Sequence, residues 1–170
     1  APGINREDFL NGRKNTAISQ CKKLLRLNPQ DVDGWDYLGE SYASLKKTDE
    51  AASCYQKVLE LTPYRPKTRL WLALQRIQQN RLDEAKELVK EETKRFEYNT
   101  EVSYLLAKIN LEEENYKETA NALDSILVEF PERIDCWEWS IQALSKLKNT
   151  VQLQSLYKKT STIELKNDRE

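Results

Sequence analysis

The sequence predicts an all-α protein, a solenoid of stacked antiparallel helix pairs, and two observations lead to this class. The 170-residue chain has only four glycines, all before residue 40, and five prolines, which disfavours architectures built from strands and tight turns. Marker residues also return at one constant interval or a multiple of it: Pro29, Pro63 and Pro131; Ala17, Ala51 and Ala85; Trp35 and Trp137. Equal spacing without insertions indicates a stack of equal units, each of which buries a face against its neighbours.

Residues 32–65 show the repeating unit in its clearest form. The spacing i, i+3, i+4, i+7 of one helix face is met by Trp35, Leu38, Gly39 and Tyr42. A polar interruption follows, and a second helical pattern is formed by Ala51, Tyr55, Val58, Leu59 and Leu61. Pro63 cannot continue a helix, so the second helix is expected to end before it.

This unit resembles the tetratricopeptide repeat, a helix–turn–helix whose length equals the interval between the marker residues. The residues that match the family pattern in order and spacing are Trp35, Leu38, Gly39, Tyr42, Ala51, Tyr55 and Pro63, while Val58 stands where Ala is usual. The resemblance implies a right-handed superhelix in which the first helices of successive repeats line a concave groove. It also implies a non-enzymatic module that binds other proteins.

The repeat length divides the chain, which is predicted to be one domain over residues 1–170. A partial or capping repeat and four further repeats are expected at residues 1–31, 32–65, 66–99, 100–133 and 134–167. Asn11-Gly12 is expected to form a turn within the first of these. In the repeat 66–99, Arg69 replaces the Trp and Glu97 replaces the Pro, and Asn80 is expected to adopt left-handed backbone angles at the turn.

The charge is balanced, with 27 basic and 28 acidic residues. Net charge alternates in sign from repeat to repeat, so no continuous basic stripe is expected, and this argues against a nucleic-acid-binding helical repeat. No apolar run is long enough to cross a bilayer, so no membrane insertion is expected. Three widely spaced cysteines, Cys21, Cys54 and Cys136, are typical of reduced thiols, which predicts an intracellular, cytoplasmic protein.

Catalysis finds little support in the residue types. The chain has no His to serve as a base, and no Gly-rich phosphate loop can form after residue 39. The densest acidic run, residues 112–114, points around a helix and cannot converge on one metal ion, so we expect a solvated face there. The sequence therefore predicts a protein that is not an enzyme, with no cofactor and no metal site.

The resemblance, and not periodicity, places a set of side chains in the concave groove. These are Asp33, Asp36, Tyr37, Glu40, Leu70, Trp71, Leu74, Tyr104, Leu105, Lys108 and Trp139. Four of them occupy one repeat position and form an apolar ladder, namely Tyr37, Trp71, Leu105 and Trp139. Large aromatic side chains at a partly exposed position are typical interface anchors. The alternative is that these four pack sideways between adjacent first helices.

The expected partner is a protein or peptide segment with apolar anchors and flanking Lys or Arg, because acidic side chains stand at both ends of the ladder. The carboxylate clamp of co-chaperone repeats is not expected, since the matching positions, among them Asp36, Glu40 and Glu101, offer no cation. A structural subunit of a larger assembly, held through its ends and outer faces, is the alternative function. Apolar residues in the last repeat also predict either a further helix beyond it or self-association through that end.

Overall fold

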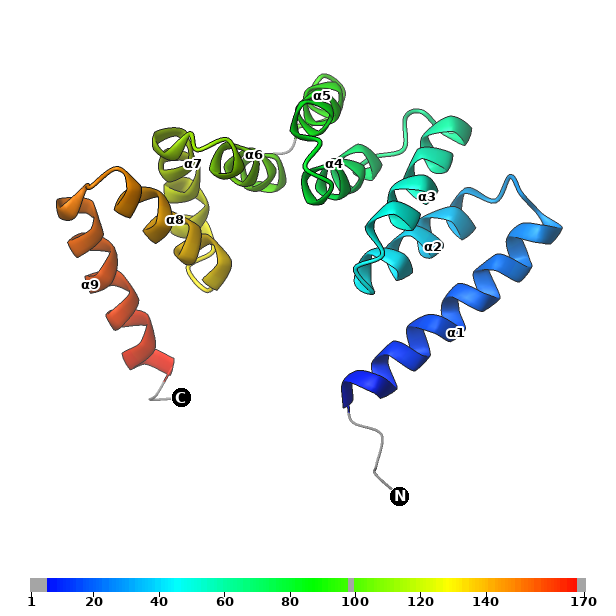
Figure 1. Cartoon of the computed structure of the whole chain (residues 1–170), viewed down its shortest axis with the longest axis horizontal. Coiled ribbons are helices and arrows are strands. Elements are labelled where there is room, and N and C mark those ends of the chain that lie inside the picture. The colour runs from blue at the N-terminus through cyan, green and yellow to red at the C-terminus, as the bar shows by residue number, and fades with distance from the viewer. Residues whose placement is uncertain (1–5, 98–99, 168–170) are drawn as a thin grey trace. The chain divides into compact units, whose positions relative to one another are not determined.

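The computed structural model describes residues 6–97 and 100–167, and for residues 6–9, 160 and 162–167 it describes the backbone only. The described residues form helices and no strand, which confirms the predicted all-α class (Figure 1). The helices are α1 (Arg6–Leu27), α2 (Val32–Ser44), α3 (Thr48–Leu61), α4 (Thr68–Gln78), α5 (Leu82–Thr93), α6 (Thr100–Glu112), α7 (Tyr116–Glu129), α8 (Ile134–Lys146) and α9 (Thr150–Asn167).

The chain divides into two compact units, unit 1 at Ala1–Glu97 and unit 2 at Tyr98–Glu170. Unit 1 contains α1 to α5 and unit 2 contains α6 to α9. The division falls close to the boundary predicted between the repeats 66–99 and 100–133. That the whole chain forms one domain stays a prediction.

Within each unit, every helix packs against the next one along the chain. The pairs α2/α3, α4/α5, α6/α7 and α8/α9 lie within the ranges 32–65, 66–99, 100–133 and 134–167, and the division into repeats with these bounds stays a prediction. Gly39 shows why the pair α2/α3 needs a small residue at its crossing. A Cβ atom on Gly39 would lie 2.8 Å from Cε1 of Tyr55 and 3.2 Å from Cβ of Cys54. The close approach of two helices therefore depends on the glycine of the repeat pattern.

Each unit has its own apolar core. In unit 1 the core cluster joins α1 to α4 through Ile18, Leu25, Leu38, Tyr42, Ala51, Ala52, Cys54, Tyr55 and Leu72. In unit 2 the cluster joins α6 to α9 through Ala107, Leu123, Ile126, Leu127, Cys136, Trp137, Leu144 and Leu156. These are mainly the positions at helical spacing, as expected when one face of each helix is buried.

The turn predicted at Asn11-Gly12 is wrong, because α1 runs without interruption from Arg6 to Leu27. Gly12 does not have a positive φ, and its carbonyl accepts a hydrogen bond from the Thr16 hydroxyl at 3.0 Å inside the helix. A glycine inside a helix costs only about 1 kcal/mol relative to alanine. Because the helix continues past Gly12, Ile18 and Leu25 of the same helix belong to the unit 1 core.

Each turn between the two helices of a pair contains one residue with left-handed backbone angles, and Lys67, just before α4, is a further one with a φ of 68°. The φ angles are 57° at Lys46, 57° at Asn80, 60° at Glu114 and 53° at Lys148. The expectation for Asn80 is thus confirmed. At the other three turns a Lys or Glu adopts the conformation that favours glycine, which costs about 1–2 kcal/mol per residue.

Glu114→Gly is expected to stabilise unit 2 by about 0.5–1 kcal/mol. Glycine removes the strain of left-handed backbone angles at this position, which stabilises the folded state. It also gives the unfolded chain more backbone entropy, which offsets part of this gain. Urea denaturation measures the change. Ser125→Gly, at an exposed position inside α7, is the matched control and should destabilise by about 0.5–1 kcal/mol. A Glu114→Gly protein that is as destabilised as the control would contradict the left-handed turn.

Candidate functional site

A cleft of about 370 Å³ opens in unit 1 between the first helices of two successive repeats, α2 and α4. Its lining comes from α2, α3, the loop after α3 and α4, and consists of Asp36, Tyr37, Glu40, Tyr55, Arg65 and Trp71. Because the repeat period brings the same face of each first helix to the same side, residues far apart in the chain meet here. Four of the predicted site residues thus line one cavity: Asp36, Tyr37, Glu40 and Trp71.

Three aromatic rings dominate this cleft. Tyr37 and Trp71 are exposed, at 62% and 41%, while Tyr55 is buried at 4%. The ring centroids of Tyr55 and Trp71 lie 5.9 Å apart at an interplanar angle of 42°, within the range of favourable aromatic pairs. The cleft therefore presents a large aromatic surface, and the buried ring of Tyr55 supports the Trp71 ring from one side.

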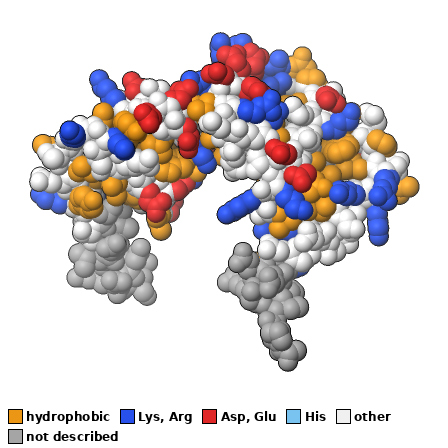
Figure 2. Space-filling view, in the orientation of Figure 1, with side chains coloured by type: hydrophobic (Ala, Val, Ile, Leu, Met, Phe, Trp, Pro, Cys, Tyr) orange, Lys and Arg blue, Asp and Glu red, His pale blue; other side chains and the backbone are white. Residues whose placement is uncertain are grey.

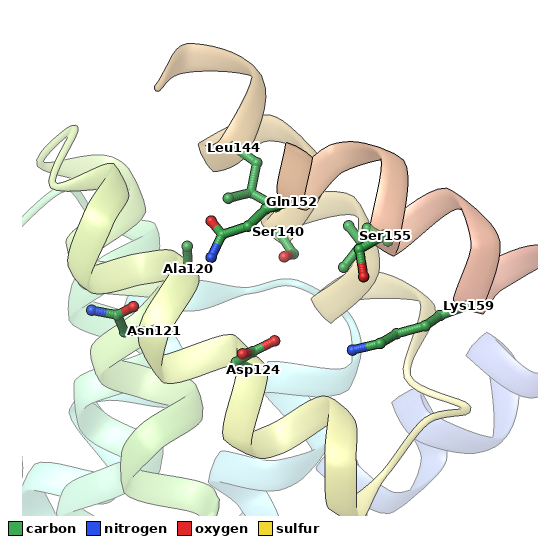
Figure 3. A pocket seen from close by; sticks show the side chains of 9 residues that line it. Ala120, Asn121, Asp124, Ser140, Leu144, Gln152, Ser155 and Lys159 are labelled. Atoms are coloured by element: carbon green, nitrogen blue, oxygen red, sulfur yellow. The ribbon is translucent and has the colours of Figure 1, made fainter. Parts of the chain in front are cut away.

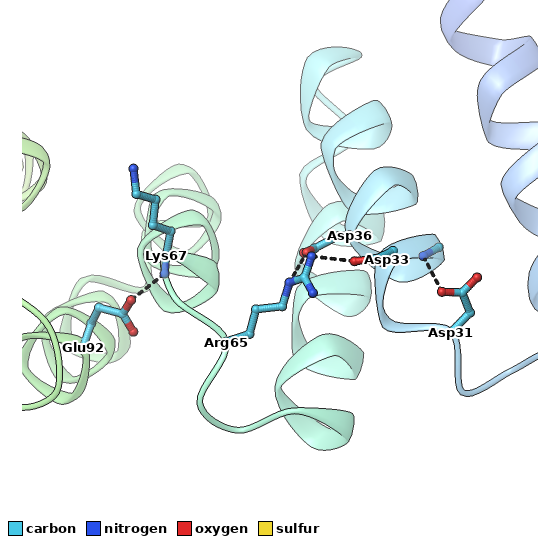
Figure 4. Close-up of polar contacts among 7 residues, drawn as sticks. Asp31, Asp33, Asp36, Arg65, Lys67 and Glu92 are labelled. Atoms are coloured by element: carbon cyan, nitrogen blue, oxygen red, sulfur yellow. Dashed lines mark hydrogen bonds and ion pairs between the residues drawn. The ribbon is translucent and has the colours of Figure 1, made fainter.

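The charges of the cleft are partly paired. Arg65 Nη2 lies 2.8 Å from Oδ1 of Asp33, and Arg65 Nε lies 2.5 Å from Oδ2 of Asp36 (Figure 4). Burial raises the pKa of Asp36, and the Arg65 guanidinium opposes that rise. Burial also raises the pKa of Tyr55, and the carboxylates of Glu40 and Asp36 add to this effect. Arg65 is thus held by two aspartates, while the exposed Glu40 adds a further negative charge beside the aromatic rings.

Unit 2 has a related cluster between its first helices, α6 and α8. The rings of Tyr104 and Trp139 lie 5.1 Å apart, and the Tyr104 hydroxyl donates a hydrogen bond to Asp135 Oδ2 at 2.8 Å. Arg133 lies over the Tyr104 ring at 4.2 Å and pairs with Asp135 at 2.9 Å, while Lys108 Nζ lies 5.6 Å from the Trp139 ring centroid. The aromatic faces of this cluster are therefore covered by cations of the chain itself.

Other members of the predicted groove are buried wholly or in part. Leu70 and Leu105 are only 4% and 5% exposed, so the expectation that they face a partner is corrected: these two side chains are core residues. Leu74 is half-buried. Trp139 is half-buried and packs against the unit 2 core, which agrees with the alternative of sideways packing for this member of the ladder. Of the four ladder side chains, Tyr37 and Trp71 are the exposed ones.

Two residues of the cleft were missed by sequence reasoning. Arg65 was not singled out, although Arg65 and Arg133 occupy the same repeat position, two repeat lengths apart, as Trp71 and Trp139 do. This recurrence of Arg at one repeat position is the sequence feature from which Arg65 could have been identified. Tyr55 was assigned to the helix pattern, and its contribution to the cleft follows only from the tertiary packing.

A second cavity, of about 170 Å³, lies in unit 2 among α7, α8 and α9 (Figure 3). Asp124 and Lys159 reach into it from opposite helices, and Ser140, Ser155 and Gln152 add polar groups. It lacks exposed aromatic side chains, so it is a weaker candidate than the unit 1 cleft. Over residues 6–97 and 100–167 we find no group of three or more potential metal ligands and no helix with the length and hydropathy to span a membrane.

Comparison with known proteins establishes the family. Residues 21–135, more than half of the chain, match the family model described as the "Cytochrome c-type biogenesis protein H TPR domain". The chain belongs to this tetratricopeptide-repeat (TPR) family. A TPR repeat-containing protein of Methanocaldococcus jannaschii, MJ0941, is 48% identical over 40 residues, which span 24% of this chain and 12% of that relative.

Solved structures of TPR-like fold agree with this assignment. MamA from Desulfovibrio magneticus RS-1 has a TM-score of 0.76 at 15% identity, with 99% of each chain covered. A tetratricopeptide repeat protein from Parabacteroides merdae has a TM-score of 0.75 at 16% identity over 89% of this chain and 59% of that one. The APC/C hetero-tetramer Cut9–Hcn1 gives 0.72 at 18% identity, over 87% of this chain and 30% of the matched chain. At these identities the likeness shows the shared TPR fold.

Proposed function

We propose that this TPR protein is a non-enzymatic interaction module that binds a segment of a partner protein in the unit 1 cleft. The observation that carries the proposal is the pair of exposed aromatic side chains, Tyr37 and Trp71, at the rim of one cleft. Exposed Trp and Tyr side chains that can be desolvated by a partner supply much of the binding energy at protein interfaces. The family of the chain supports the same function.

The charges of the cleft indicate which segments it would accept. Arg65 pairs with Asp33 and Asp36, and Glu40 lines the same cleft, so three carboxylates and one guanidinium leave a formal local charge of −2. A segment with an apolar anchor and flanking Lys or Arg is electrostatically complementary, whereas a carboxylate tail would be repelled. The acidic side chains would act mainly on orientation and association rate, and the aromatic rings on affinity.

Trp71→Ala is expected to weaken binding by at least about 2 kcal/mol, a typical hot-spot effect. Peptides are first selected from a displayed random library on the immobilised wild-type protein. The affinity of the best peptides for wild type and variant is then measured by calorimetry. We expect the selection to enrich peptides that combine apolar and basic residues.

The matched control is Tyr157→Ala, which removes a 55% exposed aromatic side chain from α9 in unit 2, outside the cleft. It should leave the affinity within about 0.5 kcal/mol of wild type. If Trp71→Ala binds the selected peptides as tightly as wild type, the cleft is not the binding site.

A second candidate function is that of a structural subunit in a larger assembly. Apolar side chains that are strongly exposed in both units support it, with Leu24 at 57% and Leu27 at 85% on α1 and Val151 at 75% on α9. Acidic and basic side chains are interspersed over the visible face in Figure 2. This mixed surface favours protein partners over nucleic acid, which requires a basic footprint.

A further inference from the structure

We propose that the unit 1 cleft receives a cationic side chain, Lys or Arg, of the partner segment against its aromatic rings. The rings are those of Tyr37, Tyr55 and Trp71, and Glu40 is the counter-charge. This inference rests on the proposed function and names the group that the cleft recognises.

The first step is a comparison of the two units at positions that lie two repeat lengths apart. Trp71 corresponds to Trp139, and Arg65 corresponds to Arg133. Both tryptophans lie on the first helix of a pair, and both arginines pair with an aspartate of their own unit. The two sites therefore share a tryptophan and an arginine, whereas Asp36, Tyr37 and Tyr55 of the cleft are replaced by Tyr104, Leu105 and Leu123 in unit 2.

The second step concerns one of the positions at which the two sites differ. Glu40 corresponds to Lys108, and in unit 2 the Lys108 ammonium lies 5.6 Å from the Trp139 ring centroid. Unit 2 thus contains an ammonium group on the ring that corresponds to Trp71. In unit 1 the same position carries the carboxylate of Glu40. A carboxylate cannot act as the cation over the Trp71 ring, but it attracts a cation of the partner to that ring.

The third step is the chemistry of the cleft. A cation over a Trp or Tyr face is held by the ring quadrupole, and the attraction grows where water is excluded. Arg65 is engaged by Asp33 and Asp36, so Glu40 is the lining carboxylate that is open to an incoming cation. The raised pKa of Tyr55, caused by burial and then by the Glu40 and Asp36 carboxylates, agrees with a negative potential at the base of the cleft. A volume of about 370 Å³ leaves room for the end of a long side chain.

The test uses the whole chain labelled with ¹⁵N, and follows the indole N–H signals of its four tryptophans by NMR. The probes are the N-acetyl, N′-methylamide derivatives of lysine, arginine, trimethyllysine and norleucine, the last being the uncharged counterpart of lysine. The signal of Trp71, assigned by its loss in Trp71→Phe, should shift saturably with the three cationic probes. The apparent affinity should exceed that for norleucine at least about fivefold. The indole N–H signal of Trp139 is the internal control. The Lys108 ammonium already lies over this ring, so the signal should not shift when the probes are added.

Two variants of one residue complete the test. Glu40→Gln keeps the rings and removes the charge, so it should weaken binding of the lysine probe several-fold. Glu40→Lys places an ammonium group of the chain itself at the position that Lys108 has in unit 2. This variant should abolish the shift of the Trp71 signal. Glu40 is exposed, so both variants are expected to fold, and their ¹⁵N spectra and thermal unfolding check this.

Equal shifts with norleucine and lysine, or undiminished lysine binding by Glu40→Lys, would overturn the cation pocket. Selected peptides that bind in a Trp71-dependent way, together with no response to any cationic probe, would also overturn it but leave the proposed function standing. Binding that is tighter for trimethyllysine than for lysine would support the pocket and assign it to a methylated partner.

Discussion

Glu92→Ala is expected to lower the free energy of unfolding by about 3–5 kcal/mol, because it removes the fully buried carboxylate of an ion pair and the acceptor of a backbone hydrogen bond. Glu92 is fully buried in α5 at 0% exposure. Its Oε1 accepts a hydrogen bond of 2.6 Å from the backbone N–H of Lys67, at the start of α4 (Figure 4). Its Oε2 lies 3.7 Å from Nη1 of Arg69. The variant would leave the Lys67 N–H without its acceptor and the 13% exposed Arg69 guanidinium without its counter-charge.

Urea denaturation measures the loss, and two variants separate its causes. Glu92→Gln keeps an acceptor for the Lys67 N–H but removes the charge, so it should cost less than Glu92→Ala. The double variant Arg69→Leu with Glu92→Leu removes both charges from the core. It should be more stable than the sum of the two single losses predicts. A loss below about 1 kcal/mol for Glu92→Ala would contradict the buried pair.

Trp137→Ala is expected to destabilise unit 2 by about 3–5 kcal/mol. Trp137 is 8% exposed in the unit 2 core, and its indole N–H donates to the Pro131 carbonyl at 2.7 Å. The variant would leave a cavity and an unpaired carbonyl in the turn between two repeats. Chemical denaturation followed by circular dichroism measures the change.

Trp137→Phe is the control, because it keeps most of the ring and loses the N–H donor, and it should cost clearly less. The place of Trp35 on the apolar face of its helix predicts that it is buried. Trp35 makes the same bond to the Pro29 carbonyl at 2.9 Å, but it is only half-buried, so this prediction is corrected. Trp35→Ala should therefore cost less than Trp137→Ala. A loss below about 1 kcal/mol for Trp137→Ala would contradict its place in the core.

The helix pairs and their period could be predicted from the sequence. Gly39, Ala51 and Tyr55 stand at positions that a helix–turn–helix needs for close packing, and the structure places them in one crossing. Such features follow from local spacing, since helix periodicity alone decides which side chains share a face. The aromatic residues Tyr37 and Trp71 could be named as site candidates for another reason, since the resemblance to the tetratricopeptide repeat implies that their position lines the groove.

The side chains that each helix face contacts could not be predicted, because these contacts depend on the tertiary packing of the helices. One repeat position holds the exposed Trp71, the buried Leu105 and the half-buried Trp139. Arg69 was identified only as a departure from the Trp position, and its partner Glu92 stands on the other helix of the pair, beyond the turn.

The sequence by itself determined the all-α class, the repeat length and the residues that face one another within a repeat, because these depend on helical spacing and on short connections. The tertiary structure decided that Tyr55 and Arg65 complete a cleft with Trp71, and that Lys108 covers Trp139 while Glu40 faces the open cleft. These contacts join residues of different helices, and burial and charge pairing across a helix interface are properties of the packed unit.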